Sequence, residues 1–107
     1  MPEETFTTGS VQLEEEETQI GHPPLFAVVF FNDDYTPMEF VVYVIQKFFG
    51  FDHAKSTEIM LQIHNDGKGY CGAFSQEIAE TKSQQINRFS KKNEHPLKTD
   101  IEELAKD

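Results

Sequence analysis

The chain has 107 residues, enough for one modest hydrophobic core and short for an enzyme that encloses its active site. Its net charge is -10 and no lysine or arginine precedes Lys47, so nucleic acid is not an expected partner. The single cysteine, Cys71, excludes an intrachain disulfide, and no apolar run approaches the ~20 residues that span a bilayer. We therefore expect a cytoplasmic protein without a signal peptide or a membrane partner.

The first 24 residues differ in composition from the rest of the chain. They are rich in Glu and Thr, include four consecutive glutamates from Glu14 to Glu17, and end in Pro23 and Pro24. Such a segment has too few apolar residues to form a core. The sequence therefore predicts a disordered acidic extension over residues 1–24 and one folded domain over residues 25–104.

The first half of the domain is expected to hold one strand and two helices. Residues 25–31 are apolar, β-branched and aromatic, and too short for a typical helix, which indicates a buried central strand. Apolar residues recur every three or four positions over residues 38–49, which predicts an amphipathic helix that Gly50 ends. Asp52 is expected to cap a second helix that runs to about Asn65.

The second half is expected to hold a strand, a helix and a strand. Residues 70–74 predict a short strand that Gly72 weakens, and Ser75 is expected to cap the third helix. The thin apolar stripe of that helix is Ile78, Ala79, Ile86 and Phe89. Pro96 stops it, and residues 97–101 alternate as a half-buried strand. The fold class is therefore α/β of the α+β type: a small, mainly antiparallel three-stranded sheet with three helices on one face, in the order β-α-α-β-α-β.

A polar turn joins the first strand to the first helix. Thr36 is expected to be the N-cap of that helix, with Pro37 in the first helical position and Glu39 closing a capping box. Just before them, Asn32 and Asp33 place an amide and a carboxylate where the strand ends. The turn therefore presents acceptors beside a helix start.

Three polar side chains form the main candidate site. The first two helices are expected to form a hairpin, which would bring His64, near the end of the second helix, close to Asn32 and Asp33. An amide oxygen, a carboxylate and a neutral imidazole nitrogen are three acceptors, and a primary ammonium has three donors, so the trio suits a free α-amino group. An adjacent recess for a side chain would be lined by Met38, Val41, Met60 and Ile63.

Other interpretations of the same residues remain open. The turn is also typical of an ordinary polar loop, with His64 facing the helix dipole. A metal site could use Asp33, Asp34, His64 and Asp66, although their spacing matches no zinc or calcium pattern. A small metal-dependent hydrolase would use Asp33, Asp34 and His64.

Two features elsewhere in the domain also have more than one interpretation. Cys71 is expected to be a small buried residue rather than a nucleophile. Glu77 and Lys82 on the third helix mark either a docking face or a solvated charged surface. A purely structural docking module, which would ignore a peptide's N-terminus, is therefore a second class of protein that fits the pattern.

Several short motifs, in matching order, resemble the ClpS adaptor family. They are NDDYTPMEFV at residues 32–41, MLQIH at 60–64, Gly67-Lys68, Cys71-Gly72, EIAETK at 77–82 and NEHPL at 93–97. The resemblance covers residues 25 to about 103. The departures, at Phe30-Phe31, Gly69 and Lys98, do not touch the expected pocket directly.

The resemblance implies an adaptor that catalyses nothing and needs no cofactor or metal. Members bind proteins with N-terminal Leu, Phe, Tyr or Trp and hand them to the ClpA unfoldase of the ClpAP protease. By similarity, Asn32, Asp33 and His64 hold the α-amino group, and Met38 acts as a gate against Ile and Val. The side-chain pocket would comprise Thr36, Pro37, Met38, Val41, Met60, Ile63 and Leu97, the last of which enters through the resemblance alone.

The resemblance also implies a surface that docks on the ClpA N-terminal domain. Tyr35, Glu77 and Lys82 match positions of that surface, and the acidic extension resembles the flexible segment that the unfoldase engages. A related unfoldase such as ClpC is an alternative partner. The ClpS-like domain of eukaryotic ubiquitin ligases is an alternative relative.

Overall fold

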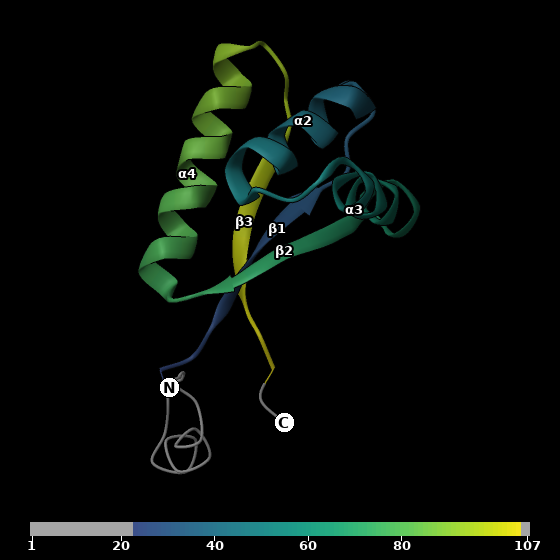
Figure 1. Cartoon of the computed structure of the whole chain (residues 1–107). Coiled ribbons are helices and arrows are strands. Elements are labelled where there is room, and N and C mark those ends of the chain that lie inside the picture. The colour runs from purple at the N-terminus through teal and green to yellow at the C-terminus, as the bar shows by residue number, and fades with distance from the viewer. Residues whose placement is uncertain (1–22, 106–107) are drawn as a thin grey trace, which may run out of the picture.

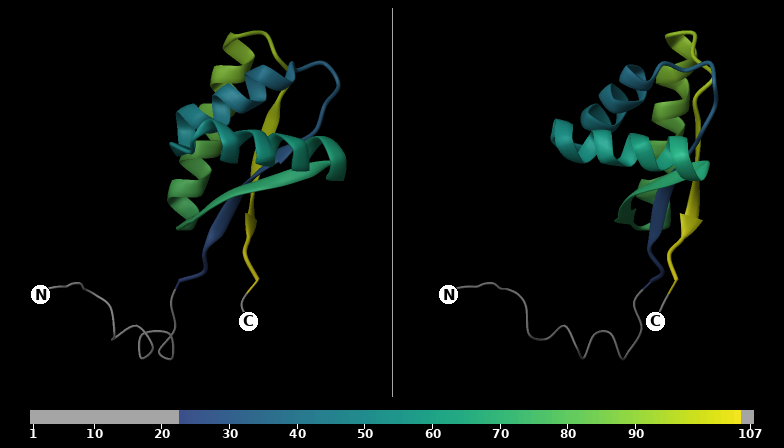
Figure 2. Two further views of the ribbon diagram at one scale, coloured as in Figure 1. Left: turned by 45° about the vertical axis from the view of Figure 1, so that its right-hand side comes forward. Right: turned by 90° about the vertical axis from the view of Figure 1, so that its right-hand side faces the viewer.

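The computed structural model describes residues 23–105, which form one sheet and three helices (Figure 1). The elements are β1 (Phe26–Phe31), α2 (Met38–Phe49), α3 (His53–Asp66), β2 (Lys68–Phe74), α4 (Gln76–Lys92) and β3 (Lys98–Glu103). The strands lie in the order β2-β1-β3, and both neighbouring pairs are antiparallel. All three helices lie on one face of the sheet (Figure 2). The predicted fold class and element order are confirmed, while residues 1–22 of the predicted extension lie outside the described residues.

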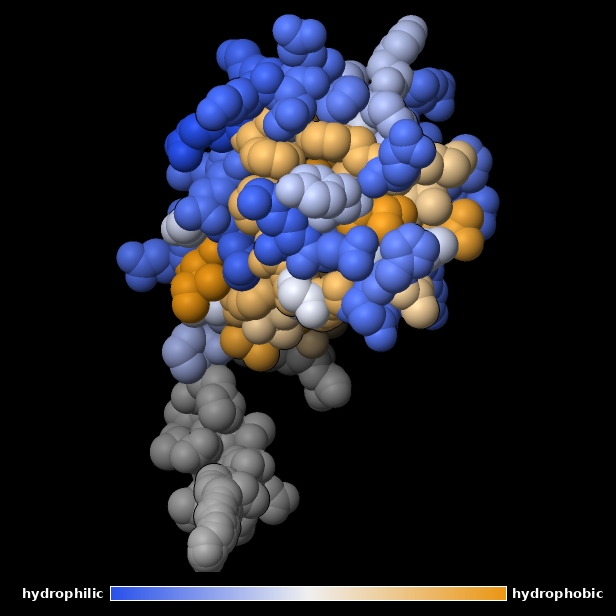
Figure 3. All heavy atoms as spheres, turned by 45° about the horizontal axis from the view of Figure 1, so that its top comes forward, coloured by the Kyte–Doolittle hydropathy of each residue, from blue (hydrophilic) through white to orange (hydrophobic). Residues whose placement is uncertain are grey.

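The core lies between the central strand and the helices. Val28 and Phe30 of β1 pack with Val44 and Ile45 of α2 and Ile86 of α4, and all five side chains are completely buried. Each contributes about 1.5–3 kcal/mol through removal of apolar surface from water. On the face seen in Figure 3, the exposed apolar residues form small groups between hydrophilic ones. No helix in residues 23–105 is long and apolar enough to cross a membrane.

The helix ends follow the local sequence signals. Gly50 and Gly67, with φ of 74° and 92°, end α2 and α3 in the left-handed conformation that glycine adopts without strain. The Asp52 side chain accepts from the Lys55 amide at the start of α3, as predicted. At the start of α4, Ser75 fills the same role, also as predicted.

The prediction that Thr36 caps α2 is wrong. The helix begins at Met38, and the N-cap residue is Pro37, which makes no side-chain capping bond. The Thr36 hydroxyl donates instead to Asp33 Oδ2 at 2.8 Å. A hydrogen bond to a charged carboxylate is about twice as strong as one between neutral groups, so Asp33 competes successfully for the hydroxyl.

Strand β2 is longer than the sequence indicates, since it begins at Lys68 rather than at Tyr70. Its pairing with β1 shifts register near the far end, beside Gly72. Gly72 has a φ of 76°, and a Cβ atom there would lie 2.3 Å from the ring of Phe74. Gly72, which made the strand over residues 70–74 harder to predict, therefore lies at an irregularity in the strand pairing that only glycine fits.

The buried face of α4 is more polar than its predicted stripe. Ala79 and Ile86 are buried as expected, but Ile78 is 51% exposed, so its assignment to the core is wrong. The serines Ser83 and Ser90 complete the buried face. Small side chains there allow a close approach to β3 that the apolar pattern alone does not reveal.

A partly buried group of hydrogen bonds joins α4 to β3, and we call it the α4–β3 seam: Ser83, Asn87 and Thr99. The Asn87 amide accepts from Thr99 N–H at 2.8 Å and donates to Thr99 C=O at 3.1 Å. The hydroxyls of Ser83 and Thr99 are 2.8 Å apart. The seam thus satisfies its polar groups internally and fixes the position of β3.

Candidate functional site

The candidate site lies at the end of β1, where three strand ends meet. Phe31, the last residue of β1, pairs with Lys68 at the start of β2 and with Lys98 at the start of β3. The backbone N–H of the next residue, Asn32, donates to the backbone carbonyl of Gly67 at 3.0 Å, and Gly67 links α3 to β2. The last turn of α3 and the residue before β3 are thereby held on either side of the β1–α2 turn.

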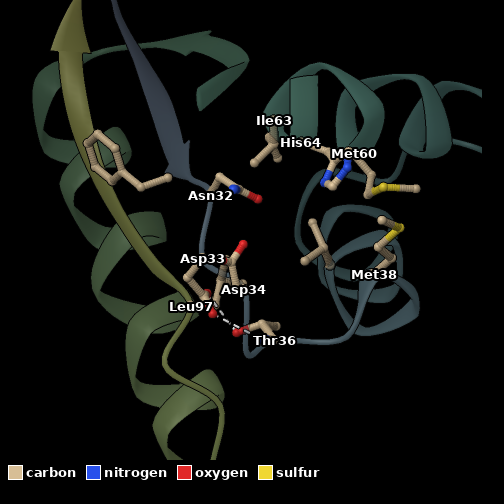
Figure 4. Close-up of a pocket in the computed structure, with 11 residues that line it drawn as sticks. Asn32, Asp33, Asp34, Thr36, Met38, Met60, Ile63, His64 and Leu97 are labelled. Atoms are coloured by element: carbon tan, nitrogen blue, oxygen red, sulfur yellow. Dashed lines mark hydrogen bonds between the residues drawn. The ribbon is translucent and has the colours of Figure 1, made fainter. Parts of the chain in front are cut away.

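A cavity of about 170 Å³ opens at this place (Figure 4). Its walls come from the β1–α2 turn, α2, α3 and the start of β3: Phe31, Asn32, Asp33, Asp34, Thr36, Met38, Val41, Met60, Ile63, His64 and Leu97. The three candidate acceptors and all of the expected pocket residues except Pro37 therefore surround one cavity.

Asp33 is held in place by three hydrogen bonds before any ligand arrives. Its Oδ1 accepts from the amides of Tyr35 and Thr36 at 2.8 and 2.9 Å, and its Oδ2 accepts from the Thr36 hydroxyl. An ionised carboxylate has about four lone-pair sites, so about one remains for a ligand. The carboxylate is thus preorganised, which lowers the entropic cost of binding.

Asn32 and His64 flank the mouth of the cavity. Both side chains are exposed, and neither hydrogen-bonds another group within residues 23–105. In Figure 4 the Asn32 amide oxygen points from the turn towards α3, which carries His64. Their acceptors are therefore available to a ligand.

The remaining wall is apolar and mostly buried. Val41, Met60, Ile63 and Leu97 are between 3 and 9% exposed and belong to the hydrophobic core. Met38 differs, because it is 48% exposed and lies at the edge of the cavity facing Met60 (Figure 4). An unbranched thioether at this edge can change its rotamer without disturbing the core.

Two lining residues were not expected in the pocket. Phe31 was assigned to the buried strand, and Asp34 was named only as a metal-ligand candidate, yet both line the cavity. Leu97 was expected through the family resemblance alone. The pairing register between β1 and β3 would have placed Leu97 at the cavity, because Leu97 directly precedes Lys98, the partner of Phe31.

The residues named for other chemistries do not form a second site. Within residues 23–105, no three His, Cys, Asp or Glu side chains are grouped closely enough to hold a metal ion. Cys71 is 1% exposed, and burial raises the pKa of its thiol to about 12 although Lys55 lowers it slightly. A thiol that keeps its proton is a poor nucleophile, so Cys71 is a core residue, as expected.

The three residues expected to dock on the unfoldase do not gather in one place. Tyr35 is 84% exposed on the β1–α2 turn, whereas Glu77 is exposed in the first turn of α4, and these segments lie at opposite ends of the domain (Figures 1 and 2). Lys82 is half-buried, and its Nζ donates to the carbonyl of Phe48 at 3.0 Å. This lysine therefore also stabilises the C-terminal end of α2.

The fold and the cavity together define a small binding domain. Acceptors lie at the mouth, an apolar wall lies behind them, and the arrangement suits a short ligand with one polar and one apolar end. Residues 21–100 match the sequence model of a family described as ATP-dependent Clp protease adaptor protein ClpS.

Similar proteins agree with this match. A Clp protease adapter protein ClpS from Alkalilimnicola ehrlichii is 52% identical over 92 residues, which cover 86% of this chain and 87% of the relative. Another from Vibrio atlanticus is 48% identical over 101 residues, which cover 94% and 95%. The chain therefore belongs to the ClpS family, whose members are protease adaptors and not enzymes.

A solved structure supports the same conclusion about the fold. Agrobacterium tumefaciens ClpS2 bound to L-phenylalaninamide superposes with a TM-score of 0.75 at 31% identity, covering 78% of this chain and 100% of that one. The ligand of that protein carries a free α-amino group and one aromatic side chain. The family membership indicated by the sequence motifs is thus confirmed.

Proposed function

We propose that the cavity binds the N-terminal residue of substrate proteins, by its free α-amino group and by a bulky hydrophobic side chain such as Leu, Phe, Tyr or Trp. The observation that carries the proposal is the union of three acceptors and an apolar wall around one cavity. The phenylalaninamide bound to the Agrobacterium relative supports it, because that ligand has the same two ends.

In this proposal the α-ammonium group meets one partner for each of its three donors. Asp33 supplies the negative charge, and Asn32 and His64 supply an amide oxygen and a neutral imidazole nitrogen. Asp33 already accepts three hydrogen bonds, so it receives the ammonium without reorganisation.

The side chain of the N-terminal residue occupies the apolar part of the cavity. Its contacts are Val41, Met60, Ile63 and Leu97, which line the cavity with Thr36 at the rim. Pro37, which does not line the cavity itself, fixes the backbone beside Thr36. Met38, at the exposed edge, contacts the β-carbon of that side chain. It thereby excludes Ile and Val, which are branched at this carbon. A cavity closed on its inner sides by core residues rejects ligands by size more than by polarity.

We further propose that the bound protein is delivered to an ATP-dependent unfoldase, ClpA or a relative, through the unfoldase's N-terminal domain. Tyr35, Glu77 and Lys82 contribute to that contact, residues 1–24 form an extension that the unfoldase engages, and residues 25–104 form the adaptor domain. The family's Clp protease partner supports this step. A cytoplasmic location is part of the proposal, because the protease needs ATP.

Binding is tested by fluorescence anisotropy with labelled peptides that differ only at the first residue. A peptide that begins with free Phe is expected to bind, while the Ile peptide and an N-acetylated Phe peptide are expected not to bind. Equal binding of the acetylated peptide would contradict the role of the acceptor trio, and equal binding of Ile would contradict the role of Met38.

Delivery is tested by ATP-dependent degradation of a reporter protein that begins with Phe, with purified ClpAP. The adaptor is expected to accelerate degradation of this reporter but not of a matched reporter that begins with Ser. Binding of the Phe peptide without faster degradation of the Phe reporter would leave recognition intact and contradict delivery.

A further inference from the structure

A second hollow lies on the other side of the two methionines. It is an open groove of about 410 Å³ between α2 and α3, which we call the α2–α3 groove. Met38 and Met60 line both the cavity and the groove. The two side chains therefore form a partition between the cavity and an open space.

The cavity has room for about one six-membered ring. A cavity of roughly 150 Å³ in another protein takes up benzene, and the cavity described above has about 170 Å³. An indole has two fused rings and needs more space, so a lining side chain has to move for a tryptophan to enter. A wall made of core residues resists such movement because protein interiors are close-packed.

The methionines are the lining residues that can give way. Val41, Ile63 and Leu97 line the cavity but not the groove, and the core lies behind them. Met38 is half-exposed and borders the groove. Met60 is 9% exposed and packs in the core, but unlike Val41, Ile63 and Leu97 it also borders the groove, so it has open space on one side. An unbranched side chain with three rotatable bonds can turn from the cavity into the groove while its backbone stays in place.

We propose that the α2–α3 groove is the recess into which Met38 and Met60 withdraw when a two-ring side chain binds. The groove residues that never touch the ligand, such as Val42, Gln46 and Thr57, then set the largest side chain that the cavity accepts. This inference rests on the proposed function and adds a specificity determinant behind the binding site. Filling the groove is expected to exclude tryptophan and to leave smaller side chains unaffected.

Thr57 offers a matched pair of substitutions. Its hydroxyl is buried and has no hydrogen-bond partner within the described residues, so Thr57→Val keeps its shape and removes an unsatisfied group. Thr57→Leu extends further and fills part of the groove from α3. Gln46→Phe, at a half-buried position, fills it from α2, so a failure of one variant to fold does not end the test.

The test measures anisotropy for three peptides that are identical except for an N-terminal Leu, Phe or Trp. The wild-type protein and Thr57→Val are expected to bind all three. Thr57→Leu and Gln46→Phe are expected to bind Trp about tenfold more weakly relative to Leu, the discrimination typical of a small size change in an apolar pocket. Circular dichroism melting checks that each variant is folded.

Three outcomes would overturn the inference. They are an equal loss for Leu and Trp, no loss for Trp in either folded groove-filling variant, and a wild-type protein that binds Leu and Phe but not Trp. In each case recognition of an N-terminal Leu or Phe still stands, because wild-type binding of both is observed, and the third outcome removes only Trp from the proposed ligands. A wild-type protein that binds none of the three peptides refutes the proposed function and the inference with it.

Discussion

Two groups of polar side chains flank the start of β3, and they differ in where their hydrogen bonds go. In the α4–β3 seam, Ser83, Asn87 and Thr99 bond to one another and to the backbone of Thr99. At the cavity, Asn32 and His64 leave their acceptors facing open space. Polar groups that satisfy each other hold a fold together, whereas polar groups beside an apolar cavity are available to recognise a ligand.

Asp33 belongs to both kinds. Three of its hydrogen bonds stay within the β1–α2 turn, as in the seam, and its remaining capacity faces the cavity. The comparison therefore predicts that changes at the cavity alter binding, that changes at the seam alter stability, and that Asp33 alters both.

The largest effect is expected for Asp33→Ala. The variant leaves the ligand's ammonium without a charge partner, so affinity for the Phe peptide should fall by about 2–5 kcal/mol. Anisotropy measures this loss, and Glu80→Ala, which removes one negative charge from an exposed position of α4 outside the cavity, is the control. Binding within twofold of the wild-type value would remove Asp33 from the site.

A smaller effect, on stability, is expected for Asn87→Ala. The variant leaves the buried N–H and C=O of Thr99 without their side-chain partner, which should lower the free energy of unfolding by about 1–3 kcal/mol. Urea denaturation measures it, with the exposed Gln84→Ala on the same helix as control. Affinity for the Phe peptide should change less than threefold. A larger loss of affinity would show that the seam also contributes to ligand binding.

Met38→Ala is expected to change selectivity by about 1–2 kcal/mol, the range for small changes of size in an apolar pocket. Removal of the side chain at the exposed edge makes room for a branched carbon, so peptides that begin with Ile or Val should bind better. Leu and Phe should still bind. Anisotropy with paired Ile and Leu peptides checks this, and no gain for Ile would show that Met38 is not the gate.

The smallest effect concerns the core rather than either polar group. Burial raises the pKa of the Cys71 thiol from its ordinary 9.0 to about 12, so above pH 9 the unfolded chain loses this proton while the folded chain keeps it. Stability is therefore fully present below pH 9 and falls by about 1.4 kcal/mol per pH unit as the pH rises towards 12. Urea denaturation should show that the free energy of unfolding falls less between pH 8 and pH 10 for Cys71→Ala than for the wild-type protein. An equal fall in both proteins would contradict the raised pKa of the Cys71 thiol.

Local chemistry made most of the fold predictable from the sequence. Gly50, Asp52 and Ser75 each act through backbone or side-chain groups within three or four residues, so helix ends could be assigned without the tertiary structure. The prediction failed at Thr36, where two local partners competed and the carboxylate of Asp33 won. It failed at Ile78 because small serines, rather than large apolar residues, face β3.

The cavity was predictable where it depends on neighbouring residues and not where it depends on strand register. Asn32, Asp33 and Met38 belong to one short turn and the helix that follows, and their types indicate recognition directly. Leu97 and Phe31 come together because of the pairing of β1 with β3, which periodicity does not reveal. Asn87 was missed for the same reason, since its partner Thr99 lies in a distant strand.

The most direct test of the account is an NMR titration of the protein with L-phenylalaninamide and, in parallel, with N-acetyl-L-phenylalaninamide. We predict that the free amine shifts the signals of the Asn32 side-chain amide, the His64 ring and the methyl groups of Ile63 and Leu97, and that the seam residues Asn87 and Thr99 stay unchanged. The acetylated compound should shift none of them at the same concentration. Equal shifts from both compounds, or shifts centred on the seam, would contradict the central claim that the cavity at the end of β1 recognises a free α-amino group.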